Sequence, residues 1–66
     1  MSPAACWRLV RTYLDAARHE RRRGARINRI MAVGEARYWA ERARGRDIDA
    51  AIASADRVWV AARRAA

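Results

Sequence analysis

Apolar residues recur along the first third of the chain at the spacing of an α-helix. From residue 3 to about residue 23 they fall on one side of a helical projection, and charged residues fall on the other. The apolar side holds Cys6, Leu9, Val10, Tyr13, Leu14 and Ala17, and the charged side holds Arg8, Arg11, Asp15, Arg18 and Arg22. Ser2 followed by Pro3 is typical of a helix start, because serine caps free N–H groups and proline fits the first helical position. We therefore predict a first helix that ends near Arg23.

Gly24 interrupts this pattern directly after three arginines. Basic residues suit the last turn of a helix, and glycine commonly follows it, so the sequence favours a turn here. The alternative is one continuous helix, since glycine within a helix costs only about 1 kcal/mol relative to alanine.

A second helix is predicted over about residues 25–44, and it has two apolar sides. One side holds Ile27, Ile30, Met31, Gly34 and Tyr38, and the other holds Ala32, Ala36, Trp39 and Ala43. Such a helix is expected to be central, either between the other two helices or between one of them and a second copy of the chain. Because glycine can also form a turn, an alternative for this segment is a helix-turn-helix motif with Gly34 in its turn. Glu35 argues against this motif, because an apolar residue usually stands at its position.

The third helix has the most regular pattern. Gly45 ends the second helix, Asp47 is expected to cap the third, and apolar residues then follow with heptad-like spacing. These residues are Ile48, Ala51, Ile52, Ala55, Val58, Trp59 and Ala62. We predict one all-α domain over residues 1–66, built as a three-helix bundle or as a helical hairpin plus a third helix. Because a chain this short buries little surface, we expect it to form a homodimer.

Charge is the strongest indication of function. The net charge is +8, and all fifteen basic residues are arginines. Codon bias in a GC-rich genome explains the absence of lysine but does not explain an excess of positive over negative charge. That excess indicates a polyanionic partner or an acidic protein surface.

The arginines are densest around the expected first turn. A cluster there could contact several phosphates, and Asn28 could add a polar contact to a base or phosphate. The nucleic-acid-binding residues predicted from the sequence are therefore Arg18, Arg21, Arg22, Arg23, Arg26, Asn28 and Arg29. We expect DNA rather than RNA. A soluble, solvated corner is the simpler interpretation of the same residues.

The alternative function is a protein-interaction module that docks on an acidic partner. Trp, Tyr and Arg are enriched at binding hot spots, and this chain has three tryptophans and two tyrosines. The residues predicted to lie at an interface, with a partner or between copies, are Trp7, Trp39, Ile48, Ile52, Val58 and Trp59.

Other classes of function find little support. His19 lies in a basic run with no nucleophile spaced to face it, Cys6 falls on the packing side, and the glutamates share no helix face. We expect no enzyme activity, no metal and no cofactor. No apolar run reaches the length of a membrane span, and a lone cysteine fits a reducing compartment, so we expect a cytoplasmic protein. Attachment of the basic side of the first helix to an anionic membrane is a third interpretation, but the apolar side of that helix is needed for packing.

Overall fold

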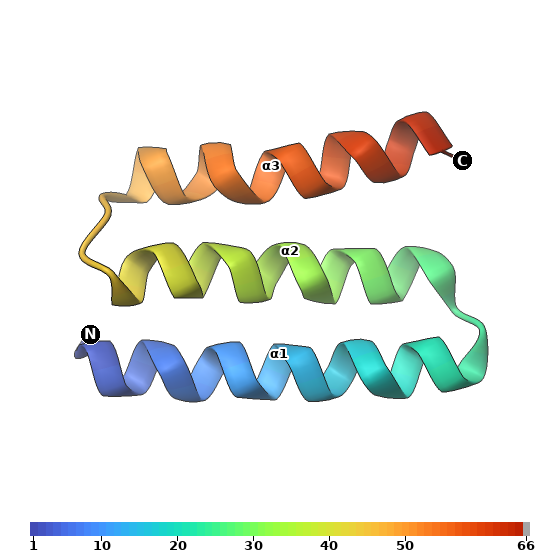
Figure 1. Cartoon of the computed structure of the whole chain (residues 1–66), viewed down its shortest axis with the longest axis horizontal. Helices are drawn as coiled ribbons and strands as arrows, with labels where there is room; N and C mark the ends of the chain where they lie inside the picture. The colour runs from blue at the N-terminus through green and yellow to red at the C-terminus, as the bar shows by residue number, and fades with distance from the viewer. Residues whose placement is uncertain (66) are drawn as a thin grey trace.

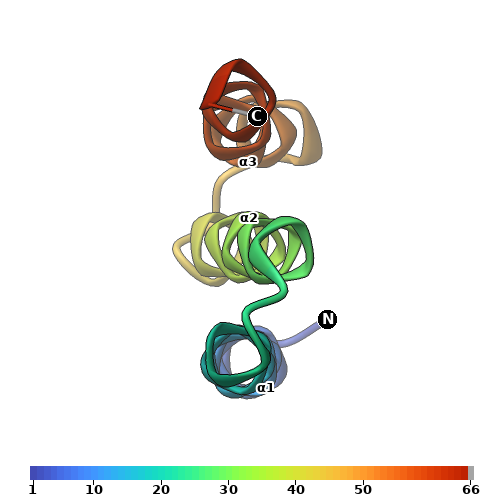
Figure 2. The same cartoon turned by 90° about the vertical axis from the view of Figure 1, so that its right-hand side faces the viewer.

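Three helices lie side by side in a single layer. The computed structural model, which describes residues 1–65, contains α1 (Pro3–Arg23), α2 (Arg26–Ala43) and α3 (Ile48–Ala65) (Figure 1). Viewed along the helices, the three are stacked in one row with α2 in the middle (Figure 2). The predicted all-α architecture with three helices is confirmed.

The helices run antiparallel in chain order. α1 packs on α2 and α2 packs on α3, whereas α1 and α3 make no contact within the described residues. The Cα atoms extend 33 × 22 × 11 Å, so the layer is one helix thick. Of the two predicted arrangements, the chain adopts the helical hairpin with a third helix beside it. The prediction that the second helix is central is confirmed.

Local capping sets the helix ends. The Ser2 hydroxyl accepts a hydrogen bond from the Ala5 N–H at 3.2 Å, and Pro3 occupies the first turn. Gly24 ends α1 in the left-handed region at φ 73°, where glycine is least strained. The Asp47 carboxylate accepts from the Ala50 N–H at 2.8 Å, and so caps α3. The predicted turn at Gly24 and cap at Asp47 are therefore both present.

Small residues let the helices approach closely. The most buried hydrophobic residues are one cysteine and five alanines, namely Cys6, Ala17, Ala32, Ala36, Ala51 and Ala55. The alanines of α2 lie toward α1, and those of α3 lie toward α2, because each set repeats at helical period on the side of the neighbouring helix. Among the described residues, no large side chain is fully buried.

Gly34 lies inside α2 and does not break it. The helix is continuous from Arg26 to Ala43, and Gly34 is buried against the Trp59 side chain of α3. The helix-turn-helix interpretation is therefore wrong: the glycine makes room for an indole ring and forms no turn.

Candidate nucleic-acid interface

The antiparallel layer brings basic residues from all three helices to one end. The last turn of α1 holds Arg21, Arg22 and Arg23, and the last turn of α3 holds Arg63 and Arg64. These two helix ends lie at the same end of the layer, on either side of the start of α2 (Figure 1). Because α3 returns to this end, the basic region is wider than the predicted corner.

Ion pairs neutralise some of the predicted corner and leave other residues unpaired. Arg18 pairs with Asp15 at 3.0 Å, and Arg23 pairs with Glu20 at 3.3 Å. Of the predicted corner, which lies wholly within the described residues, Arg21, Arg22 and Arg29 form no ion pair with a carboxylate.

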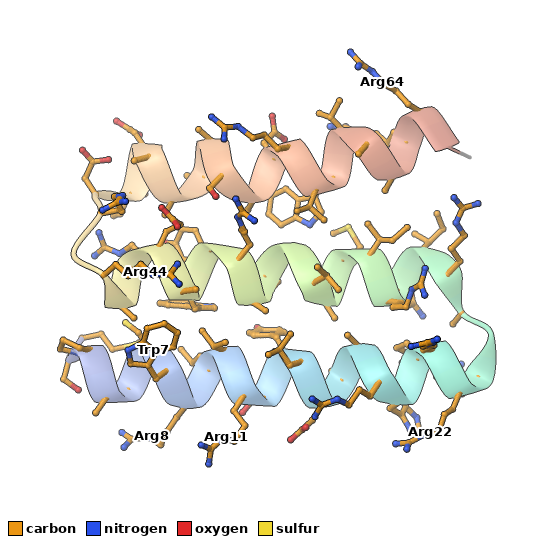
Figure 3. All side chains as sticks on the ribbon, viewed as in Figure 1. Trp7, Arg8, Arg11, Arg22, Arg44 and Arg64 are labelled. Atoms are coloured by element: carbon orange, nitrogen blue, oxygen red, sulfur yellow. The ribbon has the colours of Figure 1, made fainter. Side chains whose placement is uncertain are left out.

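The structure divides the predicted corner between different sides of the layer. Arg18, Arg21 and Arg29 line one open hollow of about 400 Å³ that reaches from α1 across α2 to Val58 of α3. Arg22 points away from the layer along the outer edge of α1, as does Arg8 (Figure 3). Arg11 also points outward from α1 but borders a hollow beside Trp7. Asn28 is exposed but lies about 200° around the helix from Arg26, since each residue advances by about 100°.

Two further hollows adjoin the first and extend it into one continuous surface. One runs along α1 from Trp7 to Arg18, and the other lies between α2 and α3 and shares Ile30 and Val58 with the first. We call this surface the arginine face. Around a strip of apolar side chains it carries Arg11, Arg18, Arg21, Arg26, Arg29, Arg37 and Arg57.

Arg44 extends this face toward the other end of the layer. Its guanidinium carbon lies 5.5 Å from the ring centroid of Trp7, within the range of a cation–π contact. Both side chains lie in front of the ribbons in Figure 3, on the same side of the layer. Arg37 is held in place as well, because its Nε donates to the buried Ser54 hydroxyl at 2.8 Å.

Carboxylates are almost absent from the arginine face. Asp15 is the one acidic residue that lines its hollows, and it is paired with Arg18. Five of the seven acidic residues follow Val33 in the chain: Glu35, Glu41, Asp47, Asp49 and Asp56. Glu41 pairs with Arg44 and Arg46, and Asp56 pairs with Arg63.

Four arginines at this face, Arg11, Arg37, Arg44 and Arg57, lie outside the nucleic-acid-binding residues predicted from the sequence. No local pattern marks them, because their proximity to Arg18 and Arg29 depends on how each helix is rotated against its neighbour. They lie outside the basic run from Arg18 to Arg29, so clustering of arginines in the sequence does not identify them.

The predicted interface residues take different environments. Trp7, Ile48 and Ile52 are exposed, with 44%, 52% and 48% of their surfaces accessible. Val58 and Trp59 are half-buried at the α2–α3 boundary. Trp39 is also half-buried: its ring meets that of Tyr38 edge to face at 4.8 Å, and its indole N–H is buried without a hydrogen-bond partner.

Within residues 1–65, no three His, Cys, Asp or Glu side chains gather as metal ligands would, and His19 is exposed. None of the described helices combines the length and the apolar run that a membrane crossing requires.

Comparison with protein-family models, with curated proteins and with solved structures finds no match to this chain.

Proposed function

We propose that the protein binds nucleic acid, duplex DNA in preference to RNA, through contacts between the arginine face and backbone phosphates. The observation that supports this is a continuous surface lined by seven arginines and one carboxylate, Asp15, which is already paired with Arg18. Arg44, which is paired with Glu41, borders this surface over the ring of Trp7. A guanidinium presents a planar fork of donors that suits phosphate oxygens. Counterions released from the phosphates supply the free energy of such binding without any sequence recognition.

The shape of the layer suits a duplex. It is 33 Å long, close to the roughly 34–36 Å of one DNA helical turn. The helices hold the backbone of these arginines at fixed positions, so little backbone freedom is lost when phosphates bind. Base contacts are not needed for this mode of binding, and the proposal includes none.

Single-stranded RNA is a poorer fit. Proteins that bind single strands stack successive bases on aromatic side chains. On the arginine face Trp7 is the aromatic residue, and Arg44 already lies over its ring. This face therefore has a phosphate-binding character without a base-stacking platform.

The test is equilibrium binding of the purified protein to a random-sequence DNA duplex and to a single-stranded RNA, followed by fluorescence anisotropy between about 50 and 200 mM salt. We expect micromolar or tighter binding to the duplex, weaker binding to the RNA, and a steep loss of affinity with salt.

A matched pair of triple variants locates the site. R18Q/R21Q/R29Q removes three charges from the arginine face, and R42Q/R46Q/R63Q removes three charges from elsewhere, so both carry the same net charge. We expect the first variant to lose most of its affinity and the second to keep most of it. Equal losses would assign binding to net charge alone and reject the face. No binding at low salt, with a stoichiometric partner retained from nuclease-treated lysate, would favour the acidic-protein alternative.

A further inference from the structure

The layer leaves large apolar side chains uncovered on the side opposite the arginine face. Ile27, Met31 and Trp59 line a hollow of about 370 Å³ between α2 and α3, together with Asp56 and Arg63. Ile30 and Ala62, at the boundary between these helices, line both this hollow and the arginine face. Ile52 lies one turn before Asp56 on the same side of α3 and is exposed. Half of the Met31 surface, 50%, is accessible to solvent.

A single layer of helices is an incomplete domain. Stable domains bury the apolar side of one layer against a second layer, and here the buried residues of the described chain are small. The uncovered apolar surface therefore indicates that something packs on the layer.

Charge distinguishes the two faces. We call the second surface the opposite face and define it by Met31, Glu35, Arg42, Ile52, Asp56 and Arg63, which follow one another at spacings of four and seven residues on α2 and on α3. It mixes acidic and basic residues around apolar ones. Two arginine faces placed together would bring many like charges into contact, whereas two opposite faces bring carboxylates and guanidinium groups together.

We infer that a second copy of this chain covers the opposite face and forms a two-fold homodimer. The whole side of the layer that contains the opposite face, α1 included, has a footprint of about 700 Å² from extents of 33 by 22 Å. This is close to the roughly 800 Å² per partner of a standard specific interface. A two-fold axis repeats each contact, so Asp56 and Arg63 of one copy can each meet a group of opposite charge on the other. The inference does not depend on nucleic-acid binding.

The decisive experiment compares two glutamate substitutions on the same helix. Met31→Glu places a charge on the opposite face, and Val33→Glu places the same charge two residues away on the arginine face, where 38% of Val33 is accessible. Sedimentation equilibrium of the full chain, without nucleic acid, measures the dimer dissociation constant. We expect a micromolar or tighter dimer for the wild type and for Val33→Glu, and a loss of at least about a hundredfold for Met31→Glu.

Ile52→Glu provides the same test from α3 and should also give monomers. A monomeric wild type, or a Val33→Glu variant as monomeric as Met31→Glu, overturns the inference. A wild type that assembles beyond a dimer rejects the two-fold arrangement.

Unfolding of a glutamate variant is detected by far-UV circular dichroism. If a glutamate variant is unfolded, the inference requires that folding and dimerisation are one transition. The wild-type melting temperature must then rise with protein concentration. A melting temperature that is independent of concentration overturns the inference.

Discussion

The indole of Trp59 lies directly on the backbone of Gly34. Its Nε1 is 3.5 Å from the carbonyl oxygen of Met31 and donates a long hydrogen bond to it. A Cβ at position 34 would overlap Nε1 and the adjoining ring carbons. This contact sets the rotation of α3 against α2, and with it the residues that each helix presents to either face of the layer.

Replacing Gly34 with alanine is expected to destabilise the protein, although alanine is the better helix former. The methyl group would displace the ring, and such overpacking typically costs about 1–3 kcal/mol, more than the roughly 1 kcal/mol of helix propensity that alanine adds. Urea denaturation measures the free energy of unfolding. In a W59L background the obstacle is removed, so the same Gly34→Ala change should be neutral or stabilising. If Gly34→Ala stabilises the protein with Trp59 present, the indole ring can shift to accommodate the added methyl group.

The Asp47 cap gives a second prediction about stability. Its carboxylate accepts from the Ala50 N–H at 2.8 Å, at the start of a helix that packs on only one neighbour. Asp47→Ala should lower the free energy of unfolding by about 1 kcal/mol, whereas Asp47→Ser should keep most of it because serine is also a good cap. The comparison is made by urea denaturation at one protein concentration. Equal losses for both variants would show that the charge, and not the cap, stabilises the helix.

Helix positions were predictable because the signals for them are local. Ser2 with Pro3, Gly24, Gly45 and Asp47 each act on backbone groups within a few residues, so the predicted ends agree with the structure to within about one residue. The central position of α2 was predictable too, because a helix with apolar residues on two sides must pack on two sides.

The arginine face was only partly predictable, because it depends on contacts between helices. Arg18 and Arg29 could be grouped from their proximity in the sequence. Arg57 joins them only when α3 lies beside α2 in one particular rotation, which the Gly34 and Trp59 contact fixes. The sequence shows Gly34 as a small residue on an apolar side but does not identify the ring that covers it.

The salt dependence of DNA binding gives a quantitative check on the arginine face. For duplex DNA the slope of log affinity against log salt is about −0.9 per phosphate neutralised. If Arg18, Arg21 and Arg29 each contact a phosphate, R18Q/R21Q/R29Q should make the slope shallower by about 2.7. The R42Q/R46Q/R63Q control should leave the wild-type slope nearly unchanged. A shallower slope in the control alone would show that the phosphate contacts are made by the α2–α3 turn and the opposite face.

Pairing through the opposite face has a consequence for binding by the dimer. When two copies cover their opposite faces, both arginine faces point outward on opposite sides, so one dimer can hold two duplexes at once. We expect the wild type to bring donor-labelled and acceptor-labelled duplexes together. Fluorescence energy transfer between the two labels measures this bridging and should peak near one dimer per two duplexes.

Excess protein should abolish the energy transfer, because each duplex then occupies its own dimer. Met31→Glu should bind single duplexes through its intact arginine face but give no transfer, since a monomer has one such face. If energy transfer persists in Met31→Glu, the two duplexes are bridged through some other contact. If a wild type that dimerises and binds DNA gives no energy transfer, one duplex occupies both arginine faces.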